Sequence, residues 1–158
     1  NRSPMIPRWE CGKTERTWRT SPHTFGNFAV RDTVFFDTDV VIWALRKHPD
    51  AIRALDRSKS PRISVITYME LIQGARNREE LGKIKFFIAN NRFRVSPLTE
   101  GIGHHAAIVL EEYHLSNGIE LTDALVASTA MESGEPLCTA NMKHFRDIKG
   151  IVIERFAP

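Results

Sequence analysis

Three acidic residues and one amide occur beside strongly apolar segments, where charged side chains are uncommon. They are Asp37, Glu70, Asp123 and Asn141. Asp37 directly follows a run of Val and Phe, and Asn141 follows a short apolar run that ends at Thr139. A carboxylate is rarely buried unless it is paired or binds a metal. These residues could therefore form one oxygen-rich pocket if the fold brings their segments together.

Each of these residues also has a simpler structural interpretation. Asp37 could end its strand in a turn, although Asp39 is better placed to cap the following helix and is favoured for that role. Asp123, in the first turn of a predicted helix, is explained by the helix dipole as readily as by catalysis. Asn141 could be an ordinary turn residue. Taken singly, the residues leave both interpretations open.

A cluster of the three acids would need a cation, because unpaired carboxylates repel one another. Carboxylate and amide oxygens, without a set of Cys and His ligands, favour Mg²⁺ or Mn²⁺ over zinc. The histidines show no metal-binding spacing, since His104 and His105 are adjacent and point to different sides of a helix. A Mg²⁺ ion held by few carboxylates leaves positions for phosphate and water, as phosphodiester hydrolysis requires.

Alternating strands and helices must position these residues. We expect strands at 33–36, 63–65, 93–95, 136–139 and 151–154, and helices at 40–47, 50–58, 67–77, 79–90, 100–115, 122–133 and 142–145. This alternation predicts an α/β fold, a three-layer α/β/α sandwich with a central, mainly parallel five-stranded sheet. In such sheets, functional sites form outside the carboxyl ends of the strands.

The composition indicates one soluble domain. The chain has 158 residues, of which 42% are hydrophobic and 26% are charged. No apolar run approaches the roughly 18 residues of a membrane span, and we expect no membrane association. Cys11 and Cys138 are too few for a disulfide framework, which favours a reducing, cytoplasmic location. Residues 1–32, rich in Pro, Gly, Ser and Arg, are expected to be an N-terminal extension, native or added by cloning, before a domain at 33–158.

Charge is distributed unevenly along the chain. Residues 46–94 hold twelve Lys and Arg against five acids, whereas residues 95–158 hold four against nine. Such cations often belong to solvated helix faces, and a phosphate-binding flank beside an acidic site is the functional alternative. The cations that we expect to steer substrate phosphates include Arg46, Lys47, Arg76, Arg78, Lys83 and Lys85.

Four short motifs carry a resemblance to a known family. Residues 36–40, residues 65–71 with Gly74 after them, residues 121–127 and residues 138–145 resemble the four motifs of PIN-domain ribonucleases, in particular the VapC-type toxins of type II toxin–antitoxin systems. The chemical positions within them are 33, 53 and 18 residues apart, in the family's order. The resemblance spans residues 34–156 and leaves residues 1–32 outside.

The resemblance implies a PIN-like fold and a magnesium-dependent endoribonuclease, in which Mn²⁺ can substitute. Asp37, Glu70 and Asp123 would be the catalytic acids and the metal ligands, joined in the site by Asn141 and by the hydroxyl of Thr139. The resemblance also implies an RNA substrate, a small antitoxin partner and a homodimer.

Two departures from the family pattern leave alternatives. Asn141 stands where the family often has Asp. Asp39 stands where the family commonly has Asn, and it could partly restore the charge of the site or only cap its helix, the role we favour. The amide lowers the formal charge of the site, and a catalytically weak PIN domain that binds RNA or protein is therefore a second hypothesis. Asp37-Thr38-Asp39 also resembles the opening of haloacid-dehalogenase-type phosphatases, but the downstream Asp pair of that class is missing.

Overall fold

A computed structural model describes residues 31–158. The predicted extension therefore lies outside the described residues, except for Arg31 and Asp32, which belong to the first strand. Within residues 31–158, no helix has the length and apolar character needed to cross a membrane.

The centre of the described region is a five-stranded sheet in which every pairing is parallel. Its strands are β1 (Arg31–Phe36), β2 (Ser58–Ser64), β3 (Arg94–Ser96), β4 (Leu137–Thr139) and β5 (Ile153–Arg155). The strand order is β3-β2-β1-β4-β5, so β1 lies in the middle and pairs with β4 through Phe35↔Leu137 and Phe36↔Cys138. The ends of β1 and β4 are thus neighbours, although about 100 residues separate them in the sequence.

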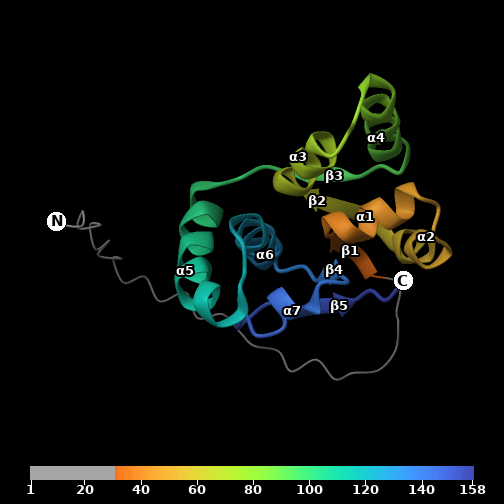
Figure 1. Ribbon diagram of the computed structural model, residues 1–158. Coiled ribbons are helices and arrows are strands. Elements are labelled where there is room, and N and C mark those ends of the chain that lie inside the picture. Colours follow the sequence, from red (N-terminus) through yellow and green to blue (C-terminus); the bar gives the residue numbers. More distant parts are fainter. Residues whose placement is uncertain (1–30) are drawn as a thin grey trace.

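Helices cover both faces of this sheet (Figure 1). They are α1 (Thr38–Leu45), α2 (Pro49–Asp56), α3 (Val65–Gln73), α4 (Arg78–Asn90), α5 (Glu100–Asn117), α6 (Leu121–Ser133) and α7 (Met142–Phe145). Buried residues of α1 to α4 form one core, and those of α5 to α7 form the other. The predicted three-layer α/β/α sandwich is confirmed.

The two cores follow from the alternation of side chains along β1. Val34 and Phe36 belong to the core with α1 to α4, whereas Phe35 belongs to the core with α5 and α6. All three side chains are almost fully buried. Successive residues of a strand point to opposite faces, so a strand covered on both sides is a continuous apolar run.

The second strand is longer than the sequence pattern predicts. β2 begins at Ser58 rather than at residue 63, and it contains Pro61. Proline normally argues against a central strand because it lacks an N–H donor. Here β3 pairs with β2 only from Arg62 onward, so Pro61 lies where β2 has β1 as its single paired neighbour.

The starts of two helices also differ from the prediction. α1 begins at Thr38, and its N-cap is Asp37, whose side chain accepts a hydrogen bond from the Thr38 N–H. The expectation that Asp39 caps this helix is therefore wrong, because Asp39 lies in the first turn. α3 begins at Val65, directly after β2, because the Ser64 hydroxyl accepts the Ile66 N–H and starts the helix there.

Candidate active site

An open pocket of about 510 Å³ lies at the carboxyl edge of the sheet. It collects residues from the end of β1, from α1 and α3, from the first turn of α6 and from the turn after β4. Its lining residues are Asp37, Thr38, Asp39, Ile42, Glu70, Gln73, Gly74, Asp123 and Asn141. All four polar residues on which the sequence analysis centred line this pocket. Its lining includes four acids and neither Lys nor Arg.

Asp37 is the most deeply placed of these acids. Its side chain accepts hydrogen bonds from the Thr38 N–H at 2.8 Å and from the Thr139 hydroxyl at 2.7 Å. Burial raises the pKa of Asp37 to about 7, and the nearby charge of Asp39 adds to the effect. The two hydrogen bonds favour the charged form but do not outweigh burial. Asp37 is thus a carboxylate in need of a positive partner.

The Thr139 hydroxyl fixes the orientation of Asp37. Thr139 is fully buried, and its Oγ1 accepts a hydrogen bond from the Asn141 N–H at 2.9 Å. Because a lone pair of Thr139 Oγ1 already accepts this N–H, the hydroxyl proton of Thr139 is directed to Asp37 Oδ2. Thr139 does not line the pocket itself, and it positions Asp37 from behind.

Glu70 reaches the pocket from α3 and is half-buried. Its Oε2 accepts a hydrogen bond from the Thr38 hydroxyl, which joins α3 to the first turn of α1. The neighbouring residues Thr67 and Leu71 are buried, as is expected for a helix with one face packed. Glu70 therefore lies at the boundary between the core and the pocket rather than inside the core.

Asp123 has two contacts in the first turn of α6. Its Oδ2 accepts the Glu120 N–H at 3.2 Å, and it lies 2.7 Å from Nδ1 of His144 on α7. The first contact gives Asp123 a structural role at the helix start, because an acid at this position closes the N-terminal turn. Asp123 also lines the pocket, so this structural role is compatible with the predicted role in the site.

His144 links two residues of the pocket. Its Nδ1 lies 2.7 Å from Asp123 Oδ2 and 2.9 Å from the side-chain amide of Asn141. A protonated Nδ1 can donate to the carboxylate, and the amide then has to present its oxygen to the ring. His144 is not among the site residues predicted from the sequence, but it lies against two of them in the structure.

Asp39 is a fourth acid of the pocket. Its Oδ2 accepts the Ala140 N–H at 2.9 Å, so its carboxylate connects α1 to the turn that carries Asn141. Burial raises the pKa of Asp39, while its hydrogen bonds to backbone N–H groups act in the opposite direction. A residue favoured as a helix cap thus connects the regions after β1 and β4 at the pocket.

The donor chemistry of the pocket fits a hard divalent cation. Asp37, Glu70 and Asp123 offer carboxylate oxygens, and the pocket lining includes neither His nor Cys. Among residues 31–158, however, no three His, Cys, Asp or Glu side chains are arranged to hold a metal ion as they stand. Each of these carboxylates already has a polar partner in the chain: the Thr139 hydroxyl donates to Asp37, the Thr38 hydroxyl donates to Glu70, and the His144 ring lies beside Asp123. A carboxylate has further lone pairs, so these contacts leave oxygen positions for a cation.

Comparisons with known proteins agree with this architecture. The family profile described as PIN domain matches residues 34–151. Ribonuclease VapC10 of Mycobacterium tuberculosis is 35% identical to this chain over 119 residues, which cover 71% of this chain and 85% of that protein. The chain belongs to the PIN-domain family. The resemblance noted in the four motifs is thereby confirmed.

Solved structures place this PIN domain among VapC-type folds. A toxin–antitoxin complex from Klebsiella pneumoniae contains a chain that is 28% identical, with a TM-score of 0.64 and coverage of 75% of this chain and 95% of that chain. VapBC-1 from nontypeable Haemophilus influenzae contains a chain that is 26% identical, with a TM-score of 0.63 and coverage of 78% and 97%. The similarity therefore extends over nearly the whole of these chains.

Proposed function

We propose that this PIN domain is a metal-dependent endoribonuclease that acts as the toxin of a toxin–antitoxin pair. The observation that carries the proposal is the gathering of four acids, from the end of β1 and from α1, α3 and α6, around one open pocket whose lining includes neither Lys nor Arg. Burial raises the pKa of Asp37 at this pocket, and the neighbouring charge of Asp39 adds to the effect. A relative carrying the name Ribonuclease VapC10 supports the same activity.

In this proposal, Asp37, Glu70 and Asp123 hold a Mg²⁺ ion, for which Mn²⁺ can substitute. A bound divalent ion supplies charge neutralisation at the phosphoryl oxygens and makes a water more acidic. Asp37 has to be ionised to bind a cation, and the Thr139 hydroxyl keeps one of its oxygens turned away from the pocket. His144 and the Glu120 N–H hold Asp123 in a similar way.

Asn141 contributes to the proposed site through its place in the turn after β4. Its N–H supports Thr139, and its side chain lines the pocket beside His144. An amide oxygen binds a hard cation more weakly than a carboxylate does. A second metal ion would therefore bind more weakly than the first.

Two partners follow from the same proposal. The solved relatives include toxin–antitoxin complexes, and we infer a small antitoxin protein as the partner of this chain. A guanidinium from such a partner suits the pocket, because it offers two parallel donors to carboxylates. We also infer a homodimer, and light scattering that detects only monomer at micromolar concentration would count against it.

The test is cleavage of RNA by the metal-stripped protein before and after addition of Mg²⁺ or Mn²⁺. We expect no cleavage of a random-sequence single-stranded RNA pool in the presence of a chelator, and restored cleavage with either ion. Asp37→Asn should remain inactive with both ions. Cleavage that persists in the chelator, or equal cleavage by this variant, would end the proposal.

A catalytically weak PIN domain that only binds RNA or protein is the alternative, because Asn141 lowers the charge of the site. The same experiment separates the two. Binding of the RNA pool without cleavage under any metal condition favours the binding module.

A further inference from the structure

Gly74 has no conformational reason to be glycine. It follows the last residue of α3 with φ −73° and ψ −10°, which is the right-handed helical region that every L-residue adopts. Glycine is less favourable than alanine in such a conformation, because the unfolded chain loses more freedom on folding. By contrast, Gly118 and Gly134 have φ of +68° and +67°, where a side chain is strained.

Packing does not require glycine at this position either. A Cβ atom on Gly74 would lie 3.4 Å from the Glu70 carbonyl oxygen and 3.7 Å from that of Leu71, which is ordinary contact distance. At Gly101, a Cβ atom would come within 2.7 Å of the Glu132 carboxylate, so a local steric reason exists there. The interior of this PIN domain thus gives no reason for glycine at Gly74.

The position of Gly74 supplies a reason from outside the chain. Gly74 is exposed and lines the acidic pocket, four residues and about one helical turn beyond Glu70. Its own N–H donates to the Glu70 carbonyl at 2.9 Å, so it is not available to bind a ligand. What Gly74 offers at the pocket is the absence of a side chain.

We propose that Gly74 is a substrate-clearance position, at which the sugar–phosphate backbone of an RNA strand crosses the rim of the pocket beside Glu70. The inference rests on the proposed ribonuclease function and adds the path of the strand. A bare helix end lets the strand approach the acids closely, whereas a side chain would occupy the space where ribose and phosphate have to pass. Glycine at the end of α3 then stabilises the fold less than alanine would, but it leaves room for the RNA strand to reach the pocket.

The experiment compares Gly74→Ala and Gly74→Leu with Gly103→Ala. Gly103 is a matched control, because it is an exposed glycine in the first turn of α5, has open space around its Cβ position and does not line the pocket. We expect both alanine variants to melt at the wild-type Tm or above it. For the cleavage of a random-sequence single-stranded RNA pool, KM should rise severalfold in Gly74→Ala and at least about tenfold in Gly74→Leu, with little change in kcat.

Further readouts separate substrate clearance from other roles. The affinity of each variant for Mn²⁺, measured by calorimetry without RNA, should equal that of the wild type. Weakened Mn²⁺ binding, or a lowered Tm for Gly74→Ala, would assign Gly74 to the metal site or to the fold and overturn the inference. Unchanged KM in both Gly74 variants of a protein whose wild type cleaves would overturn the inference alone. A wild type that neither cleaves nor binds the RNA pool would overturn the proposed function, and this inference with it.

Discussion

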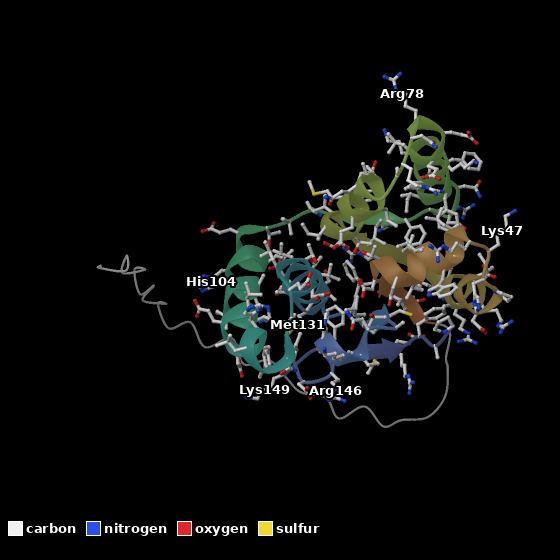
Figure 2. All side chains as sticks on the ribbon, in the orientation of Figure 1. Lys47, Arg78, His104, Met131, Arg146 and Lys149 are labelled. Atoms are coloured by element: carbon white, nitrogen blue, oxygen red, sulfur yellow. The ribbon has the colours of Figure 1, made fainter. Side chains whose placement is uncertain are left out.

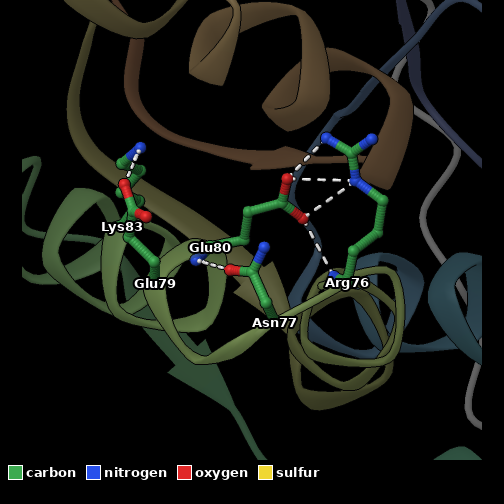
Figure 3. Close-up of polar contacts among 5 residues, drawn as sticks. All are labelled: Arg76, Asn77, Glu79, Glu80 and Lys83. Atoms are coloured by element: carbon green, nitrogen blue, oxygen red, sulfur yellow. Dashed lines mark hydrogen bonds and ion pairs between the residues drawn. The ribbon is translucent and has the colours of Figure 1, made fainter.

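Carboxylates in two regions of the molecule have opposite electrostatic surroundings. In the pocket, burial and the charge of Asp39 raise the pKa of Asp37 to about 7. On α4, hydrogen bonds from Lys83 and Arg76 hold the pKa of Glu79 and of Glu80 below their ordinary values. Figure 3 shows these pairs on the exposed helix, where Glu80 accepts several hydrogen bonds from one Arg76 side chain.

The difference separates acids whose ionised form stabilises the fold from acids whose ionised form destabilises it. An acid with a lowered pKa is more stable ionised in the folded chain than in the unfolded chain, whereas an acid with a raised pKa is less stable. Asp37 thus weakens the fold at neutral pH, which is typical of a functional group.

Replacement of Asp37 should affect activity and stability in opposite directions. We expect Asp37→Asn to reduce metal-dependent RNA cleavage by more than about 100-fold, beyond the range usual for outer-shell residues of a metal site. Without metal, the same variant should have a higher Tm, because it removes a buried negative charge beside Asp39. Thermal melting and cleavage assays check both parts, and a variant that is active or markedly less stable would contradict the contrast.

The pH dependence of stability should show the raised pKa of Asp37 directly. The folded protein binds a proton here up to about pH 7, whereas the unfolded chain releases it near pH 4. The free energy of unfolding of the metal-free protein should therefore fall as pH rises from 4 to 7, by an amount on the order of 4 kcal/mol at most. Urea unfolding at several pH values measures it. A wild-type slope equal to that of Asp37→Asn would contradict the assignment.

Replacement of Asn141 by an acid should increase the negative charge of the pocket and its affinity for a cation. Asn141→Asp places a further carboxylate among the existing ones, so the Tm of the metal-free protein should decrease through repulsion. The affinity for Mn²⁺ should increase, most visibly for any second ion, because hard cations favour carboxylate over amide oxygen. Cleavage should be retained or raised. Calorimetric titration of Mn²⁺ tests the effect, and unchanged affinity and stoichiometry would place Asn141 outside the metal site.

The sequence predicted most of the fold and four residues of the pocket, because these depend on local patterns. The apolar run of β1 and the polar residue after it specify a strand that ends at the carboxyl edge of a parallel sheet. The role of Asp39 could not be predicted, because its acceptor position depends on β4, about 100 residues away. The same holds for His144, whose contact with Asp123 requires α6 and α7 to pack together. Pairing between distant segments is the information that a pattern of residue types lacks.

The cations of residues 46–94 should make a smaller contribution to RNA binding than their number indicates. Arg76 and Lys83 are already paired with Glu80 and Glu79. Of the six cations named for this role, Arg46, Lys47, Arg78 and Lys85 then remain for phosphates. These four are also spread out, because Arg78 points into solvent at the outer end of α4, far from Lys47 (Figure 2). Fluorescence anisotropy of a labelled single-stranded RNA, with increasing NaCl, should give a log–log slope no steeper than about −3. A slope near zero would remove the electrostatic role altogether.

The ion pairs of α4 should give the smallest effect, with the sign opposite to that of Asp37. Glu79→Gln removes the exposed pair with Lys83, four residues later on the same helix. The pKa of Glu79 is lowered, so its contribution to stability is present above its unfolded pKa and is lost as pH falls through the lower folded value. Because solvent and salt screen such pairs, Tm should change by no more than about 2 °C at neutral pH, and by less in high salt. If Glu79→Gln lowers Tm even in 1 M NaCl, the effect is not that of a screened surface pair. If it raises Tm, as expected for Asp37→Asn, the acid on α4 destabilises the fold as the pocket acid does. Either result would contradict the contrast between the two regions.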